Sequence, residues 1–144
     1  MTRSDDVIKP AGHRISTGSI EEVINEVPGV VESATLGYVE AIRGEIPLAF
    51  IVLRDTFPND DDKRQELINL VETSVRESVG AFAKLHGVII VSRLPKTRSG
   101  KILRGTMKKI VNNEEYTVPA TIEDESVLGE IKEAIQRFLR EKTA

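Results

Sequence analysis

The stretch 94–104 carries the side chains with the most evident chemical use in this chain. It reads Leu-Pro-Lys-Thr-Arg-Ser-Gly-Lys-Ile-Leu-Arg and holds four cations and no acid. Its proline, serine and glycine predict a turn, because each favours a reversal of the backbone. The β-branched run from Val88 to Val91 just before it predicts a buried strand. Lys101 is therefore expected on a loop between ordered elements, where its ammonium group can contact an anion.

Three interpretations of this loop follow from its residues alone. A solvated basic turn is the ordinary one, and it involves no ligand. A phosphate-binding loop requires Gly, four residues, Gly, Lys and then Ser or Thr. That spacing fails, because Pro95 stands five positions before Gly100 and Ile102 follows Lys101. A nucleic-acid patch fits the charge, but the loop has no aromatic side chain on which a base could stack.

A fourth interpretation rests on a resemblance that includes a second stretch of the chain. The loop closely resembles the last core motif of the adenylate-forming enzymes, the acyl-CoA synthetase group. Near the start, Arg3-Ser-Asp-Asp-Val-Ile and Gly12-His-Arg-Ile-Ser resemble the hinge and the following core motif of the same family. Motifs in the family's order are far more specific together than either is alone. The resemblance runs from Arg3 to about Leu139, and it covers only the small C-terminal domain of such an enzyme.

The resemblance implies a catalytic lysine and a hinge. Lys101 matches the lysine that stabilises negative charge on the α-phosphate of ATP while a carboxylate attacks it. A long flexible side chain on a turn suits this role, since it must reach oxygens of both reactants. Asp5 matches the hinge residue about which the domain rotates between two half-reactions.

The resemblance also implies binding residues, each with an ordinary alternative. Arg3 and Arg14 match residues that contact the ribose and the phosphates of the nucleotide. For Arg14 the alternative is a surface salt bridge with one of the two glutamates, at 21 and 22, that follow it. Gly12 matches a glycine that lets the pantetheine of CoA pass close to the backbone, or it is a simple turn glycine. Arg76 matches an arginine that meets the 3′-phosphate of CoA, or it is a solvated helix residue.

The activity that the resemblance implies has two steps. Carboxylate and ATP give acyl-adenylate and pyrophosphate, and the acyl group then passes to CoA with release of AMP. The tail from Asn112 to Leu128, which contains Thr121-Ile-Glu-Asp after an extended run, looks most like propionyl-CoA synthetases and their short-chain relatives. Acetate or propionate is therefore the expected substrate. The resemblance implies that the pockets for ATP, the acyl group and Mg²⁺ belong to an N-terminal domain, which is expected to lie outside these 144 residues. Residues 1–144 are expected to form a single, mobile C-terminal domain that binds no cofactor stably and is inactive alone.

The expected partners are the chain's own N-terminal domain, a short-chain carboxylate, ATP and CoA. A lysine acyltransferase or deacylase acting on Lys101 is a further expectation, because acylation would remove its charge. Neither nucleic acid nor a membrane is expected as a partner. The alternative function is a stand-alone, non-catalytic interaction or ligand-binding module of the same fold. Nucleic-acid binding, the third class, would show itself as steeply salt-dependent binding to DNA or RNA.

Composition fits one domain with a segregated charge. The chain has 144 residues, no cysteine and a net charge of −3, so a single core without disulfides is expected. Between positions 78 and 113 there are eight Lys or Arg and no Asp or Glu. One acid-free region in an acidic chain predicts a small anionic ligand there. With no signal-like start and no long apolar run, the protein is expected to be soluble and cytoplasmic.

Hydrophobic periodicity and turn residues predict an α+β fold. The expectation is a small central three-stranded sheet flanked by helices, with a short extended pair near the N-terminus, the last as implied by the resemblance. A capping box of Ser19 and Glu22 predicts the start of the first helix. The other expected elements are strands over 30–39, 46–53 and 88–91, helices over 59–80 and 102–111, an extended run over 116–122 and a C-terminal helix with its apolar stripe over 127–139.

Overall fold

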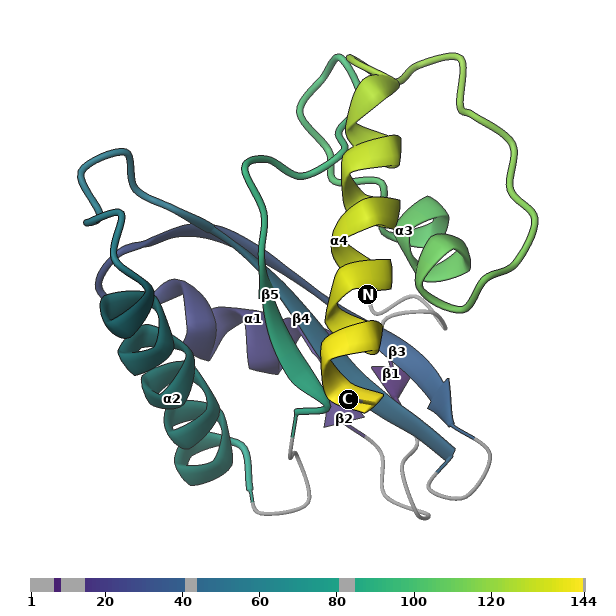
Figure 1. The fold of residues 1–144 in the computed structure, drawn as a ribbon. Helices are drawn as coiled ribbons and strands as arrows, with labels where there is room; N and C mark the ends of the chain where they lie inside the picture. The colour runs from purple at the N-terminus through teal and green to yellow at the C-terminus, as the bar shows by residue number, and fades with distance from the viewer. Residues whose placement is uncertain (1–6, 9–14, 41–43, 81–84, 144) are drawn as a thin grey trace.

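A twisted three-stranded sheet lies between two layers of helices (Figure 1). In this computed structural model, residues 7–8, 15–40, 44–80 and 85–143 are described. The central sheet has the order β3-β4-β5, and a separate two-stranded sheet pairs β1 with β2 near the start of the chain. The strands are β1 (Val7–Ile8), β2 (Ile15–Ser16), β3 (Val30–Glu40), β4 (Gly44–Leu53) and β5 (Gly87–Ile90). The expected α+β class, with its central three-stranded sheet and short extended pair, is confirmed.

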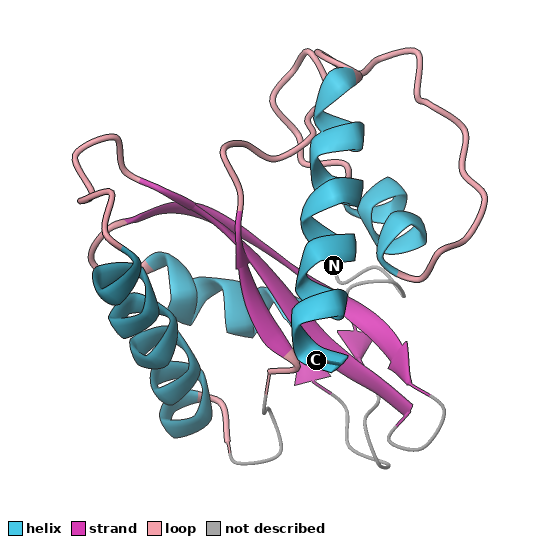
Figure 2. Ribbon diagram, in the orientation of Figure 1, coloured by secondary structure: helices cyan, strands magenta, loops and turns pink. Residues whose placement is uncertain are grey.

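Two helices cover each face of the central sheet (Figure 2). Residues of α1 (Thr17–Asn25) and α2 (Asp61–Ser78) pack against one face, and those of α3 (Arg104–Val111) and α4 (Ser126–Thr143) pack against the other. Within the described residues, no helix combines the length and the apolar character that crossing a membrane would require.

The central strand β4 supplies both halves of the core. It pairs antiparallel with β3 and parallel with β5, and its apolar run is buried on both faces, as its composition predicted. Ala49 and Ile51 face the α1 and α2 layer, whereas Leu48 and Phe50 face the α3 and α4 layer. This alternation follows from the period-2 geometry of a strand, so one strand binds the two helical layers together.

The predicted capping box at the first helix is wrong by one turn. Helix α1 begins at Thr17, and the hydroxyl of Ser16 accepts the N–H of Ser19 at 3.4 Å. Ser16 has the extended backbone of an N-cap (φ −78°, ψ 124°), while Ser19 already lies inside the helix and Glu22 is exposed. The acidic start expected for the second helix is confirmed, because Asp60 caps α2 and accepts the N–H of Asp62 at 2.8 Å.

Side chains of the flanking helices satisfy the outer edge of β3, which pairs with no further strand in the described chain. The carboxylate of Glu21 accepts the N–H of Thr35 at 2.7 Å. Asn112 accepts the N–H of Val39 at 2.8 Å and donates to the carbonyl of Gly37 at 2.9 Å. Polar side chains from α1 and from the end of α3 thus take the place of a fourth strand. These contacts fix both helices against the sheet, and Glu21 also contacts Arg104, at the end of the segment that carries Lys101.

Candidate functional site

The lysine loop, residues 94–104, is a narrow hairpin. Thr97 donates its N–H to the carbonyl of Lys101 at 2.8 Å, and Gly100 donates to the carbonyl of Thr97 at 2.9 Å. The hydroxyl of Thr97 accepts the N–H of Lys101 at 3.1 Å, and Lys96 pairs with Ile102 as an antiparallel bridge. Gly100 has φ +92°, a left-handed backbone that favours glycine at this turn. Both the N–H and the carbonyl of Lys101 are therefore held by Thr97 across the turn, and the predicted turn is confirmed.

The bridge at Ile102 also corrects a helix boundary. The helix expected over 102–111 begins only at Arg104. Ile102 is engaged in the hairpin, and Leu103 donates its N–H to the carbonyl of Pro95 at 2.9 Å. The hairpin therefore closes at its base before the helix starts.

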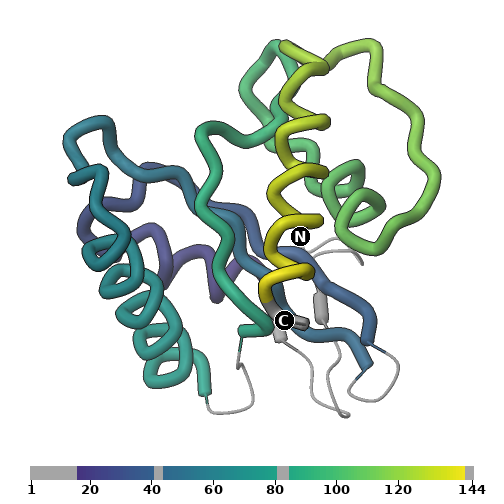
Figure 3. Tube along the Cα trace, in the orientation of Figure 1, coloured from purple at the N-terminus to yellow at the C-terminus, as the bar shows by residue number. Residues whose placement is uncertain are grey.

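A long segment, residues 113–125, runs from the end of α3 to the start of α4 (Figure 3), and its last residues add a further edge to the hairpin. We call this segment the strap. Arg98 donates its N–H to the carbonyl of Thr121 at 2.9 Å, and Glu123 donates to the carbonyl of Lys96 at 2.9 Å. Ile122 forms a bridge with Thr97 and is 8% exposed, so it anchors the strap in the core. The sequence predicted an extended run here, but it gave no indication that this run supports the lysine loop.

A cluster around Arg93 ties the start of the loop to the end of the strap. Its guanidinium contacts Asp124 at 3.0 Å and Glu130 at 2.8 Å. The pKa of Asp124 lies below its ordinary value, first because Ser126 donates hydrogen bonds from its hydroxyl and its N–H, and then because of Arg93. The pKa of Glu130 is also lowered, first by the hydrogen bond from Arg93 and then by that from Ser92. The pKa of Arg93 is raised in turn, chiefly by Glu130.

The Arg93→Gln variant is expected to raise the pKa of Glu130 towards its ordinary value, because the largest cause of its lowering is removed. Carboxyl-detected NMR titration of the 144-residue chain measures this shift. Since the folded-state pKa values of Asp124 and Glu130 are lowered, their stabilising contribution is present above the ordinary carboxyl pKa of about 4. It is lost as the pH falls through the lowered values. The control, Arg137→Gln, should leave the pKa of Glu130 unchanged. If Arg93→Gln also left it unchanged, Arg93 would not be the cause of the lowered pKa.

The four cations of the lysine loop have two different environments. Lys96 pairs with Glu32 of β3 at 2.7 Å, and Arg104 pairs with Glu21 of α1. Arg98 and Lys101 are exposed, and no acid of the described chain pairs with either side chain. The acids that neutralise the base of the loop are distant in sequence, so the sequence could not reveal them as its partners. Judged by the described residues, the two cations nearest the tip are the ones that remain available to an outside anion.

Glu21 is the residue of this region that the sequence could have indicated. It lies on the buried side of α1 with Thr17, Ile20 and Ile24, and a lone acid on an apolar helical stripe is unusual. The alternative interpretation of Arg14 paired it with one of the glutamates at 21 and 22. The carboxylate of Glu21 is held by Arg104 and the Thr35 N–H; Arg14 lies outside the described residues, so this alternative stays a prediction.

Of the other expected site residues, Arg76 is the one that lies within the described part of the chain. Arg3, Asp5, Gly12 and Arg14 lie outside the described residues. Arg76 is exposed in the last turn of α2. In Figure 1 that end of α2 lies at the bottom of the view and the lysine loop at the top. Any ligand that contacts both within one isolated domain would have to span the molecule.

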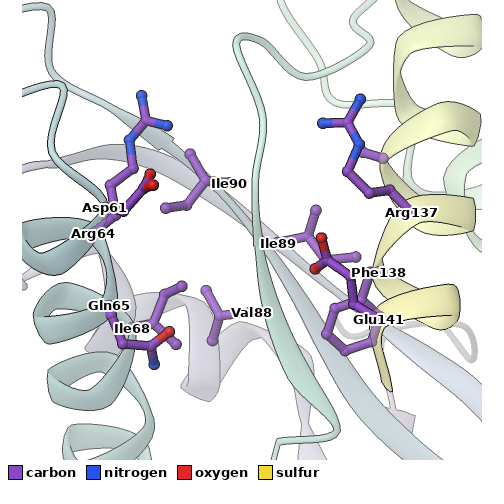
Figure 4. A pocket seen from close by; sticks show the side chains of 11 residues that line it. Asp61, Arg64, Gln65, Ile68, Val88, Ile89, Ile90, Arg137, Phe138 and Glu141 are labelled. Atoms are coloured by element: carbon purple, nitrogen blue, oxygen red, sulfur yellow. The ribbon is translucent and has the colours of Figure 1, made fainter. Parts of the chain in front are cut away.

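A pocket of about 410 Å³ lies between α2 and the second half of α4, with β5 as its floor (Figure 4). Arg64 of α2 and Arg137 of α4 stand on opposite sides of β5. Asp61 and Glu141 also line the pocket, so its charge is mixed and favours neither sign of ligand. No residue of the lysine loop contributes to it. Among the described residues, no cluster of three His, Asp or Glu side chains could hold a metal ion.

Comparison with known proteins identifies the family. The family described as the AMP-binding enzyme C-terminal domain matches residues 19–101, more than half of the chain. The chain belongs to this family. The matched region of this AMP-binding C-terminal domain holds both acids that anchor the lysine loop, and it ends at Lys101.

Relatives carry this domain within much longer chains. A mitochondrial acyl-CoA synthetase short-chain family member B of Dictyostelium discoideum is 46% identical over 96% of this chain and 20% of its own length. Acetyl-coenzyme A synthetase of Pyrobaculum aerophilum is 39% identical over 98% of this chain and 20% of its own. ATP-bound MatB from Rhodopseudomonas palustris superimposes with a TM-score of 0.62 at 29% identity, over 76% of this chain and 21% of that one. The chain therefore spans about a fifth of the length of these proteins.

Proposed function

We propose that this chain is the C-terminal lid domain of an ATP-dependent short-chain acyl-CoA synthetase and that it supplies the adenylation lysine, Lys101. The observation that carries the proposal is the lysine loop itself. Its backbone is hydrogen-bonded on both sides of the turn, its basal cations are neutralised, and the Lys101 side chain projects from it without an acidic partner in the described chain. The relatives' names support the activity and the short acyl chain.

In the first half-reaction, a carboxylate oxygen attacks the α-phosphorus of ATP and pyrophosphate leaves. Two anions approach each other, and negative charge spreads over the oxygens in transit. The Lys101 ammonium lowers this electrostatic cost when the lid presents it to the nucleotide held by the N-terminal domain. Because the lysine loop is already fixed by hydrogen bonds, little conformational entropy is lost in ordering it when the reaction occurs.

In the second half-reaction, the thiol of CoA attacks the acyl carbonyl and AMP leaves. The lid rotates about Asp5 between the two steps, so a different face of the domain meets the same site. Gly12 and Arg76 serve CoA in this orientation, while Arg3 and Arg14 contact the nucleotide. The large separation of Arg76 from the lysine loop supports this division, since one static orientation could not use both. Mg²⁺ is held by the N-terminal domain.

Two further expectations belong to this proposal. The exposed position of Lys101 leaves its amine accessible to a lysine acyltransferase or deacylase, and acylation would remove the charge that adenylation requires. A stand-alone module of the same fold is less favoured, because the relatives carry the domain as part of a longer chain.

The test is a substrate profile of the intact polypeptide, with acetate, propionate and butyrate. ATP–pyrophosphate exchange reports acyl-adenylate formation, and thioester formation with CoA reports the second step. We expect both activities with a short-chain acid, and neither from the 144-residue chain alone under the same conditions. Thioester formation by the isolated chain, or no adenylation of any carboxylate by the intact protein, would refute the proposal.

A further inference from the structure

Glu21 is a buried acid at the junction of three elements. Glu21 is 7% exposed. The next residue, Glu22, lies on the solvent side of the same helix. One carboxylate oxygen accepts the N–H of Thr35 on β3 at 2.7 Å. A buried carboxylate is costly unless it is hydrogen-bonded and paired with a cation. Its position therefore depends on the cation that reaches it from α3.

That cation is Arg104, the first residue of α3. Its Nε donates to Oε2 of Glu21 at 3.3 Å, and a terminal nitrogen of the guanidinium donates to Oε1. The contact is two-pronged, which fixes the orientation of both groups as well as their separation. No side chain caps the start of α3 at Leu103. The ion pair with Glu21 therefore fixes the first residue of the helix through its side chain.

A second ion pair holds the opposite side of the loop. Lys96 contacts Glu32 of β3 at 2.7 Å, and Lys96 also pairs with Ile102 across the base of the hairpin. Lys101 lies between Lys96 and Arg104, three residues before the latter. Both ends of the loop are therefore fixed by acids, one end by Glu32 of β3 and the other by Glu21 of α1. Glu21 is the more buried of the two.

We propose that Glu21 is a positioning residue for Lys101: through Arg104 it sets the point from which the catalytic ammonium extends. This inference rests on the proposed function and deepens it. Glu21 touches neither nucleotide nor carboxylate in this role. It acts only through the orientation of the loop, so it serves the half-reaction that uses Lys101 and has no part in the transfer to CoA.

The geometry sets the expected size of the effect. A displacement of about 1 Å at a reacting group costs on the order of 10²-fold in rate. The strap and the Lys96 pair remain when Glu21 is altered, so the loop should shift without collapsing. We therefore expect Glu21→Gln to reduce adenylation by about 10- to 100-fold. The glutamine amide keeps an oxygen for the Thr35 N–H and loses the charge that holds Arg104.

The experiment uses the full-length protein and separates the half-reactions. ATP–pyrophosphate exchange with a short-chain acid measures adenylation, and thioester formation from supplied acyl-adenylate and CoA measures the second step. Glu21→Gln should slow adenylation and leave thioester formation within about twofold of the unaltered protein. The kcat of adenylation should fall while the KM for ATP stays unchanged. Glu22→Gln is the matched control, because it removes the neighbouring exposed acid of the same helix. Equal slowing of both half-reactions would overturn the inference, since that is the result of general damage.

A double-mutant cycle tests whether Glu21 acts through Lys101. In a Lys101→Ala background, Glu21→Gln should cause no further loss of adenylation. A full additional loss would overturn the inference, because Glu21 would then act independently of the lysine. If Lys101→Ala slows adenylation and Glu21→Gln does not, the inference fails while the proposed function stands. If Lys101→Ala itself leaves adenylation unchanged, both fail.

A second variant addresses the same contact from the other side, in case Glu21→Gln does not fold. Arg104→Lys keeps the positive charge but cannot make the two-pronged contact. It should reproduce the slowing of adenylation alone, to a smaller extent than Glu21→Gln. Unaltered rates in both half-reactions with Arg104→Lys would count against the positioning role.

Discussion

Replacing Lys101 by alanine in the full-length protein is expected to slow acyl-adenylate formation by about 10²–10³-fold, the loss typical of one electrostatic donor at a developing oxyanion. The reason lies in the loop. The neighbouring cations Lys96 and Arg104 are occupied by Glu32 and Glu21, so neither can substitute for the missing ammonium. Transfer of the acyl group from supplied acyl-adenylate to CoA should be unchanged, because that step does not use the lysine.

Rapid-quench measurement of acyl-adenylate, with the thioester step assayed separately, checks this result. Arg98→Ala is the matched control, since Arg98 is the other exposed cation of the loop tip without an acidic partner in the described chain. We expect it to retain most of the adenylation rate. Lys101→Gln, which mimics loss of charge by acylation, should behave like Lys101→Ala. An undiminished rate of adenylation in Lys101→Ala would remove the assignment of Lys101.

Replacing Phe50 by alanine is expected to lower the free energy of unfolding by about 3–5 kcal/mol, the usual cost of deleting a buried phenylalanine ring. Phe50 is 0% exposed in the central strand β4, and its ring is the largest fully buried side chain of the core. It packs in the half that includes Met107 of α3 and Ile131 of α4. The cavity would therefore loosen the helices that support the lysine loop. The total free energy of unfolding of a domain is typically only about 5–15 kcal/mol, so this loss is a large part of it.

Urea unfolding of the 144-residue chain, followed by circular dichroism, measures the change. Leu70→Ala serves as the control, because Leu70 is 47% exposed and its truncation should cost less than about 1 kcal/mol. If both variants lost the same small amount, the position of Phe50 at the centre of the core would be contradicted.

The sequence predicted the elements of the fold well wherever local preference and burial agree. In three places a few neighbouring residues were enough to predict the element: the apolar run of β4, the acidic start of α2 and the apolar stripe of α4. The errors fell at boundaries. The first helix begins earlier than Ser19 because Ser16 adopts the capping backbone, and α3 begins later than Ile102 because a hairpin bond holds that residue. The parallel pairing of β4 with β5 follows from the helix α2 that connects them, and no residue within either strand indicates it.

The site divides in the same way between sequence and structure. The sequence by itself determined that a turn carries Lys101 among four cations, because Pro, Ser and Gly at those positions fix a local reversal and the charges can be counted. Only the tertiary structure decided which of those cations are available. Glu21 and Glu32 neutralise two of them across long sequence separations, and the strap completes the edge of the hairpin. Ion pairs and strand contacts between distant segments depend on how the whole chain packs, and local preferences carry no information about that packing.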